Sequence, residues 1–431
     1  MDQQSAGGSR DRGLPAVRVL PVAPMTILGI YSWTRLWSMG QRAGAESFSL
    51  SLQAFPRYNH TLHVVAPREA GQPTFEELDG IRLHRLPAAR DFLPNPFRQP
   101  RAARIAERIG KYAAFQWASA SAAVELGRRI RPDAVVAYGA FAVPAARWTA
   151  MRLGVPNVTR LFGQSLNLCV GNRLKFYGNF PEIFAMKCPA AYVILHDDGA
   201  EGDIMARRLK VPAERFRYWK NGIDPDFYQP DLDTLTVRHE LGWGPNEIIL
   251  FAVARMVYEK HLERLVGILP RLLEAEPRIR LLLVGDGPKR PETETLAQEL
   301  GVADKVRFVG AQPREALPRF FNTGDIFCSV SDRTNGGNPT VEAMYCGRCA
   351  VVLNTGGTAR LVEDGRTGIV IEPERLEELP ARILEAARDP ELRRRLGSAA
   401  REEMARQMPT IAERQKMEVD LVAQAVAEAR R

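Results

Sequence analysis

The chain has 431 residues, of which 45% are apolar and 26% are charged, and its formal net charge is +8. This length exceeds a usual single domain and fits two domains of roughly 200 residues, each large enough to bury a core. The apolar fraction is ordinary for a globular enzyme, which excludes a fibrous or disordered chain. The longest apolar stretch, residues 134–146, is shorter than the roughly 20 residues of a membrane-spanning helix.

The positive charge favours an anionic partner, such as a nucleotide, a phosphate, an acidic membrane or a nucleic acid. The sequence carries no zinc-finger or RNA-binding signature, so we do not expect nucleic acid. The cysteines are odd in number and too sparse for a disulfide framework. Cys346 and Cys349 form a C-x-x-C pair without the second pair of a zinc site or the context of a redox motif. We therefore expect them to pack in the core.

Residues 1–24 are polar and glycine-rich, and they predict a disordered leader without the pattern of a signal peptide. We therefore expect a cytoplasmic protein. From Met25 onward, apolar runs typical of strands alternate with helical segments. The predicted strands are residues 25–33, 60–67, 80–87, 133–139, 156–163 and 190–196, and the predicted helices are residues 48–54, 101–129 and 143–153.

Residues 220–235 interrupt this alternation with glycine, prolines and aspartates, as a linker between domains does. The alternation then restarts. The further predicted strands are residues 248–255, 279–287, 305–310, 325–331, 349–354 and 368–372, and the further helices are residues 262–275, 293–300, one through Phe321, and 340–347.

This order predicts an α/β fold of two doubly wound, Rossmann-like domains with parallel sheets. Ligands of such domains bind at the carboxyl ends of the strands, so we expect an interdomain cleft. The predicted divisions are a first domain over residues 25–222, a linker over 223–245, a second domain over 246–407 and a final helical segment over 408–431.

Two basic residues, Arg255 and Lys260, follow a predicted strand on the loop that leads into the next helix. Arginine grips phosphate oxygens with two donors and lysine supplies a point charge, so the pair can neutralise a departing diphosphate. A solvated surface pair is the alternative interpretation.

A second segment, SDRTNGGNPTVEAMYCG, runs from a strand through a glycine loop into a helix. Asn338 is the expected N-cap and Pro339 the first helical residue. Free amides at such a helix start bind anions, and Glu342 on the first turn can accept hydrogen bonds from a ribose. The alternative is a plain capped helix in which Glu342 only favours the helix dipole. The loop GQRAGAES, which contains Gly44, is a weaker candidate on the first domain.

Several motifs stand in a fixed order from Met25 onward: AGAES, WKNGIDPDFYQP, ARMVYEK, LLLVGDGP, VRFVG, TVEAMYCG and TGGTARLVEDGRTGIVIEP. With them the sequence resembles the retaining glycosyltransferases of the GT-B fold, specifically glycosyltransferase family four, or glycosyl transferases group 1. The resemblance implies transfer of a sugar from a UDP- or GDP-sugar donor to a hydroxyl acceptor. That acceptor would be a glycan, a lipid-linked glycan or a small metabolite, and no metal or other cofactor is implied.

The resemblance also implies roles for individual residues. Arg255 and Lys260 would be the catalytic groups on the diphosphate, and Glu342 would hold the ribose. The segment near Val309 would lie against the base, and the final helix would return to the first domain. The full set of implied or candidate donor-binding residues is Gly44, Val309, Gly310, Asp332, Thr334, Gly336, Gly337, Asn338, Pro339, Thr340 and Glu342.

The sequence departs from the family pattern at several places. Thr334 stands where the family has its first glutamate, with Asp332 nearby as a substitute, and Arg360 occupies a commonly acidic place. Tyr138 stands where a cleft histidine is usual, and Arg160 is expected in the cleft on the next strand. His196, at a strand end beside Asp197 and Asp198, is either a general base or part of a helix cap with Asp198 as the cap.

Other functions stay open on this fold, namely a nucleotide-sugar epimerase, a phosphorylase or a catalytically weak binding subunit. Asp224 and Asp226 form a D-x-D, but their loop offers too few oxygen ligands for a metal, and we expect none. On the helix at 101–129, Arg101, Arg104, Arg108 and Lys111 share one stripe. This stripe predicts either an ordinary amphipathic helix or peripheral contact with an anionic membrane, at its inner face.

Overall fold

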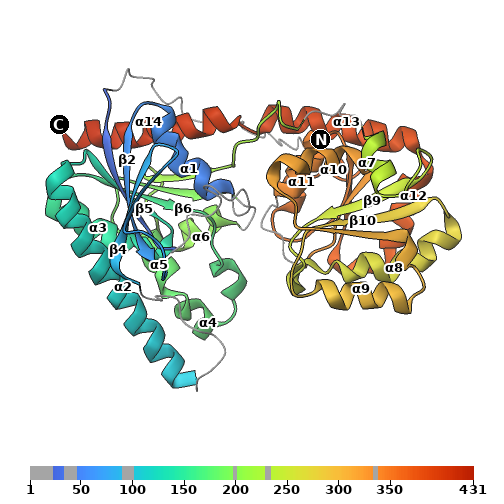
Figure 1. Cartoon of the computed structure of the whole chain (residues 1–431), viewed down its shortest axis with the longest axis horizontal. Coiled ribbons are helices and arrows are strands. Elements are labelled where there is room, and N and C mark those ends of the chain that lie inside the picture. The colour runs from blue at the N-terminus through green and yellow to red at the C-terminus, as the bar shows by residue number, and fades with distance from the viewer. Residues whose placement is uncertain (1–22, 34–45, 90–100, 198–200, 229–233, 333–337) are drawn as a thin grey trace, which may run out of the picture.

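The computed structural model describes residues 23–33, 46–89, 101–197, 201–228, 234–332 and 338–431. They form two α/β units, each built around its own sheet (Figure 1). The first sheet has the strand order β3-β4-β2-β1-β5-β6-β7-β8, and the second has the order β11-β10-β9-β12-β13-β14. All strand pairs are parallel except β3 with β4. The predicted fold class of two doubly wound domains is confirmed.

The first unit contains all strands and helices up to residue 219. Its strands are β1 (Thr26–Tyr31), β2 (Thr61–Arg68), β3 (Phe75–Leu78), β4 (Ile81–Ala89), β5 (Ala134–Tyr138), β6 (Asn157–Leu161), β7 (Tyr192–His196) and β8 (Phe216–Trp219). Its helices are α1 (Glu46–Arg57), α2 (Arg101–Ile130), α3 (Val143–Leu153), α4 (Arg173–Gly178), α5 (Phe180–Lys187) and α6 (Gly202–Arg208).

The second unit follows, and one last helix comes after it. The strands are β9 (Ile248–Val253), β10 (Ile279–Val284), β11 (Val306–Gly310), β12 (Ile326–Ser329), β13 (Cys349–Leu353) and β14 (Ile369–Ile371). The helices are α7 (Leu235–Glu240), α8 (Glu263–Ala275), α9 (Arg290–Glu299), α10 (Leu317–Thr323), α11 (Asn338–Tyr345), α12 (Leu379–Arg388), α13 (Pro390–Gln407) and α14 (Ile411–Ala429).

Both sheets are covered by helices on their two faces, because successive side chains of a strand point to opposite sides. In β1, Ile27 packs into a core with α1 and α14, whereas Leu28 packs into a separate core with α2 and α3. In β9, Leu250 packs with α8 and α12, whereas Phe251 packs with α7, α10 and α11. The continuous apolar runs of the sequence follow from this double coverage.

The chain passes between the units twice, and the two passages run side by side. The amide of Ile223 donates to the carbonyl of Pro409 at 3.0 Å, and the amide of Ile411 donates to the carbonyl of Ile223 at 3.0 Å. After this junction α14 lies along the first sheet beside α1, although it follows the second unit in sequence (Figure 1).

The structure adds elements that the sequence analysis did not predict. Strand β3 is one of them, and its hairpin with the predicted strand β4 turns at Asp79 and Gly80, both with positive φ, which is an Asp-Gly turn signal. Strand β8 directly precedes the linker-like residues. Helix α7, inside the segment expected as linker, packs in the second unit through Val237. Helix α11 begins at Asn338 itself, so Asn338 is not its N-cap.

The five cysteines are all buried and free, Cys346 and Cys349 among them. Burial raises the pKa of both thiols to about 12. Their packing in the second unit therefore matches the interpretation of this pair as core residues.

Candidate active site

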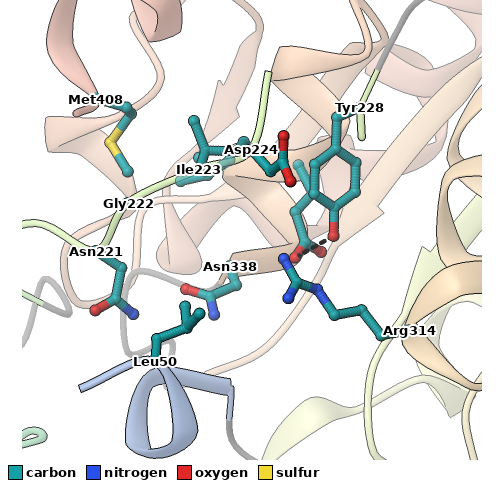
Figure 2. A pocket seen from close by; sticks show the side chains of 11 residues that line it. Leu50, Asn221, Gly222, Ile223, Asp224, Tyr228, Arg314, Asn338 and Met408 are labelled. Atoms are coloured by element: carbon teal, nitrogen blue, oxygen red, sulfur yellow. Dashed lines mark hydrogen bonds between the residues drawn. The ribbon is translucent and has the colours of Figure 1, made fainter. Parts of the chain in front are cut away.

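Residues of both units line a pocket at the junction, which is open to solvent (Figure 2). Leu50 contributes from α1, and Val341 and Glu342 contribute from α11. Asn338, the first residue of α11, also lines it. The remaining lining residues come from the junction and from the turn before α10: Asn221, Gly222, Ile223, Asp224, Tyr228, Arg314 and Met408. The pocket thus lies where the two passages of the chain meet the start of α11.

Two further pockets adjoin this first one. One, of about 390 Å³, shares Asn338 with it and reaches His196 at the end of β7 and Arg360 of the second unit. The other, of about 360 Å³, lies at the ends of β9 and β12 and is lined by Lys260, Pro339 and Thr340. The first turn of α11 therefore borders all three pockets.

Glu342 projects from α11 into the first pocket and is only 8% exposed. The hydroxyl of Tyr228 donates a hydrogen bond to its Oε1 atom at 2.8 Å. The guanidinium of Arg314, which lies 5.1 Å from the ring centre of Phe227, reaches toward Tyr228 (Figure 2). A carboxylate on this pocket wall can accept hydrogen bonds from a polar ligand.

Lys260 ends a short 3₁₀ turn, Tyr258–Lys260, between β9 and α8. Burial lowers its pKa from the ordinary 10.5, the positive charge of Arg255 lowers it further, and Glu259 partly offsets both. Arg255 itself is exposed on the same loop. The ammonium of Lys260 and the start of α11 line the same pocket, where an anion would neutralise the buried charge.

The GDG sequence after β10 lets the backbone of residues 285–287 lie close to the loop that follows β9. A Cβ atom at Gly285 would lie 1.9 Å from the carbonyl oxygen of Ala254, and one at Gly287 would lie 2.4 Å from that of Met256. Both glycines also have positive φ. Only glycine fits such a close approach, which places the loop of Arg255 and Lys260 against β10.

The remaining donor candidates are distributed differently. Val309 is partly buried and packs against the core that contains Phe251. The carbonyl of Gly310 accepts a hydrogen bond from the amide of Gly285 at 2.9 Å. Asp332 contacts Nε2 of His261 and forms an ion pair with Arg264. The structure brings together Lys260, Asn338, Pro339, Thr340 and Glu342 around α11. Gly44, Thr334, Gly336 and Gly337 lie outside the described residues.

Tyr138 is not a cleft residue, which corrects the expectation from the sequence. It is fully buried in the core beneath α14, and its ring lies against Gly29, where an added Cβ atom would meet Tyr138 Cε2 at 2.9 Å. The alternation of β5 places this side chain on a helix-covered face rather than at the sheet edge. Burial raises the pKa of its hydroxyl well above the ordinary 10.

Arg160 is buried as well, at 1% exposure, and its partner comes from the last helix. Its Nε atom lies 3.3 Å from Oε2 of Glu418, which also pairs with Arg414 at 3.2 Å. These three residues line a cavity of about 270 Å³ that shares Asn221 with the first pocket. The guanidinium of Arg160 is thus directed toward α14 below the cleft instead of into it.

His196 lies in the second pocket together with Lys220 and Asn221. Burial lowers its pKa to about 3, and the charges of Arg160 and Arg414 add to the effect. The imidazole is therefore neutral at ordinary pH. Asp198, the alternative cap of the next helix, lies outside the described residues, and that helix, α6, begins at Gly202.

The sequence analysis missed several residues of the site. Tyr228 and Asn221 lie in the segment interpreted as a linker, and Met408 lies at the second passage between the units. The motif WKNGIDPDFYQP was the available signal for the first two, because a linker rich in specific residues at a cleft contributes to its wall.

Comparisons with known proteins find one matching family model and several similar sequences. Residues 233–403 match the family described as glycosyl transferases group 1. The chain is 30% identical over 203 residues to an alpha-D-kanosaminyltransferase of Streptomyces kanamyceticus, which is 47% of this chain and 52% of that protein. It is 28% identical over 221 residues to a GDP-mannose-dependent alpha-(1-6)-phosphatidylinositol monomannoside mannosyltransferase of Mycolicibacterium smegmatis, which is 47% and 57%. The chain thus spans about half the length of the curated relatives it matches.

Solved structures match over nearly the whole chain. A sucrose-phosphate synthase from Thermosynechococcus elongatus superposes with a TM-score of 0.71 and 19% identity, covering 94% of this chain and all of that one. HepE from Anabaena, in complex with UDP and glucose, gives a TM-score of 0.67 at 18% identity, covering 92% and 99%. At this identity the likeness shows the fold alone, and that fold is GT-B.

Proposed function

Because residues 233–403 match the family described as glycosyl transferases group 1 and the fold is GT-B, we propose that this chain is a retaining glycosyltransferase. It transfers a sugar from a nucleotide-sugar donor to a hydroxyl group of an acceptor. The observation that carries the proposal is the half-buried Lys260, which lines one pocket together with the first turn of α11. An ammonium opposite the amides of a helix start is suited to a diphosphate.

In the proposed reaction the bond between the sugar and the diphosphate ionises first. Lys260, Arg255 and the amides at the start of α11 stabilise the negative charge that builds on the leaving diphosphate. The acceptor hydroxyl then attacks the same face of the sugar and passes its proton to the leaving phosphate, so no protein nucleophile is required. Such preorganised charge is worth several kcal/mol in other enzymes.

Glu342 is the proposed ribose ligand, held in place by the hydroxyl of Tyr228. The segment at Val309 and Gly310 would lie against the base. We propose a UDP- or GDP-sugar as donor. A mannosyltransferase relative is described as GDP-mannose-dependent, and the similar HepE structure contains UDP.

The acceptor would enter from the first unit, through the pocket that contains His196 and Arg360. A glycan, a lipid-linked glycan and a small metabolite are all compatible with this opening. The imidazole of His196 is neutral, and its low pKa makes it a poor base. We therefore assign it to orienting the acceptor hydroxyl by a hydrogen bond.

Replacement of the central lysine tests the proposal. Lys260→Ala should lower turnover about 10²- to 10³-fold, as loss of one stabilising donor does in other enzymes. Lys305→Ala is the matched control, because Lys305 is paired with Asp304 before β11, away from the three pockets. A Lys260→Ala rate within about a factor of two of wild type would sink the assignment.

The other activities of this fold are separated by their products. Incubation with a nucleotide sugar and no acceptor yields an epimer if the chain is an epimerase, and nucleotide binding without any turnover indicates a binding subunit. We also propose that transfer needs no metal, since Lys260 and the amides of α11 supply the positive field. A chelator should then leave the rate unchanged, and restoration by Mg²⁺ after chelation would contradict this.

We extend the proposal to peripheral contact with an anionic membrane. Within the described residues, no helix is both long and apolar enough to cross a bilayer. In α4, however, Leu174 is 81% and Tyr177 is 68% exposed, beside the exposed Arg173 and Lys175. Apolar side chains flanked by basic ones are typical of a surface that contacts acidic lipids.

The arginine stripe of α2 stays a prediction for the same kind of contact. The side chains of Arg101, Arg104 and Arg108 lie outside the described ones, and Lys111 pairs with Glu107 at 2.9 Å. The double variant Leu174→Ser with Tyr177→Ser should lose sedimentation with anionic vesicles. Met151→Ser, an exposed position on α3, is the control, and equal binding to neutral vesicles would contradict the proposal.

A further inference from the structure

His261, the residue after Lys260, has an unusual backbone. Its φ is +49°, the left-handed region that favours glycine. His261 is only 7% exposed. The other described non-glycine residues with positive φ are all exposed: Asn59, Asp79, Arg131, Glu201 and Lys210. A buried side chain that holds a strained backbone is over-determined by its surroundings, and such residues cluster at functional sites.

The surroundings are two carboxylates, one on each side of the ring. Nδ1 of His261 lies 2.7 Å from Oε1 of Glu263 at the start of α8. Nε2 lies 2.8 Å from Oδ2 of Asp332, just beyond the end of β12. Arg264 reinforces this link, because its NH1 atom lies 2.6 Å from Oδ1 of Asp332 and also donates to the carbonyl of Val330 at 2.8 Å.

This link joins the two walls of the pocket that contains Lys260. The residues on both sides of His261, Lys260 and Leu262, line that pocket, while the imidazole is paired with Asp332. Asp332 follows Ser331, which lines the opposite wall, and it precedes by a few residues the first turn of α11. One ring therefore connects the turn that carries the cation to the strand end that leads to the helix amides.

We propose that His261 is a positioning residue for the donor diphosphate. It fixes the distance between the Lys260 turn and the end of β12, so that the ammonium and the start of α11 act on one anion together. The inference rests on the proposed function, because it assigns His261 to the same site. Glycine would adopt this backbone without strain, but it would leave the two walls unlinked.

The test uses the full chain and measures the affinity for UDP and GDP by calorimetry. His261→Gly keeps the backbone conformation, so we expect a folded chain that binds the nucleoside diphosphate about tenfold more weakly. Asp332→Ala removes the carboxylate that contacts Nε2 of His261 and should weaken binding similarly. Because the Asp332 side chain is half-exposed, this second variant tests the same contact even if His261→Gly does not fold. Arg131→Gly is the matched control, because Arg131 has the same φ of +49° but is exposed. This variant should bind the nucleoside diphosphate as wild type does.

A double-variant cycle distinguishes positioning from general stabilisation. If His261 acts through Lys260, His261→Gly should cause no further loss of affinity in a Lys260→Ala background. Wild-type affinity in both folded single variants would overturn the inference, and so would equal losses with and without Lys260. Failure of the proposed function has a different signature, namely no nucleoside diphosphate binding by wild type or full binding by Lys260→Ala.

Discussion

Gly222 lies where the two passages between the units run side by side, and the neighbouring backbone leaves no room for a side chain at this position. A Cβ atom there would lie 2.6 Å from Cα of Ile411, 2.7 Å from the carbonyl oxygen of Thr410 and 2.8 Å from the amide nitrogen of Ile411. All three atoms belong to the backbone, so no rotamer change can relieve the overlap. In Gly222→Ala the passages must therefore move apart.

The separation has a cost that follows from the hydrogen bonds between the two passages. Ile223 exchanges one backbone hydrogen bond with Pro409 and one with Ile411, each 3.0 Å long. Loss of two such bonds with the residual overlap should destabilise the chain by about 2–4 kcal/mol. For units of this size that corresponds to a fall in Tm of roughly 5–15 °C.

Calorimetric unfolding of the full chain measures this effect against a matched control. Gly267→Ala is the control, because Gly267 lies inside α8 and an added Cβ atom would have no neighbour within 4 Å. Alanine there should stabilise the helix by about 0.5–1 kcal/mol. If Gly222→Ala unfolded at the temperature of wild type, the tight contact of the two passages would be refuted.

Three further predictions concern charged groups near the pockets. Tyr228→Phe removes the hydroxyl that holds Glu342, so nucleoside diphosphate affinity measured by calorimetry should fall about tenfold, or about 1.4 kcal/mol; unchanged affinity would contradict the ribose assignment. Arg160→Met leaves Glu418 with less compensation in a buried site and should cost about 3–5 kcal/mol in urea unfolding, and a smaller cost than 1 kcal/mol would contradict the paired arrangement. Because folding lowers the pKa of Lys260 below 10.5, its burial destabilises the chain at neutral pH, and stability is regained as pH rises through the lowered pKa toward 10.5. Lys260→Met should therefore be more stable than wild type at pH 7 and lose that advantage near pH 10.5, and a constant difference across this range would argue against the shifted pKa.

The sequence predicted those parts of the molecule that depend on neighbours along the chain. Strands and helices follow from local apolar patterns, and the place of Lys260 follows from a strand, a loop and a helix in succession. The GDG segment carries its own reason, because Gly285 and Gly287 leave room for the backbone of that loop. The Asp79-Gly80 turn was an equally local signal, unused, for the strand β3 that pairs with the predicted β4.

Partners that lie far apart in sequence could not be predicted in the same way. Ser51 donates to Glu418 across 367 positions, and Tyr228 donates to Glu342 across 114. The pattern of a strand also does not show which of its last residues will be covered by a helix from a distant part of the chain. Tyr138 is covered in this way by α14, which begins at Ile411. The expectation of a cleft tyrosine therefore failed, because that helix closes the face on which Tyr138 lies.

The buried charges of this chain fall into two kinds, and the difference separates scaffold from site. Arg160 and Arg414 are matched inside the protein by Glu418, which accepts from both and from Ser51, and they fasten α14 to the first sheet. Among the described residues no carboxylate forms an ion pair with Lys260, although burial lowers its pKa. A half-buried charge whose described neighbours form no ion pair with it costs stability, and a diphosphate would supply a partner. The strained backbone at His261 lies directly beside Lys260. A ligand bound there would offset both the strain and the cost of the half-buried charge.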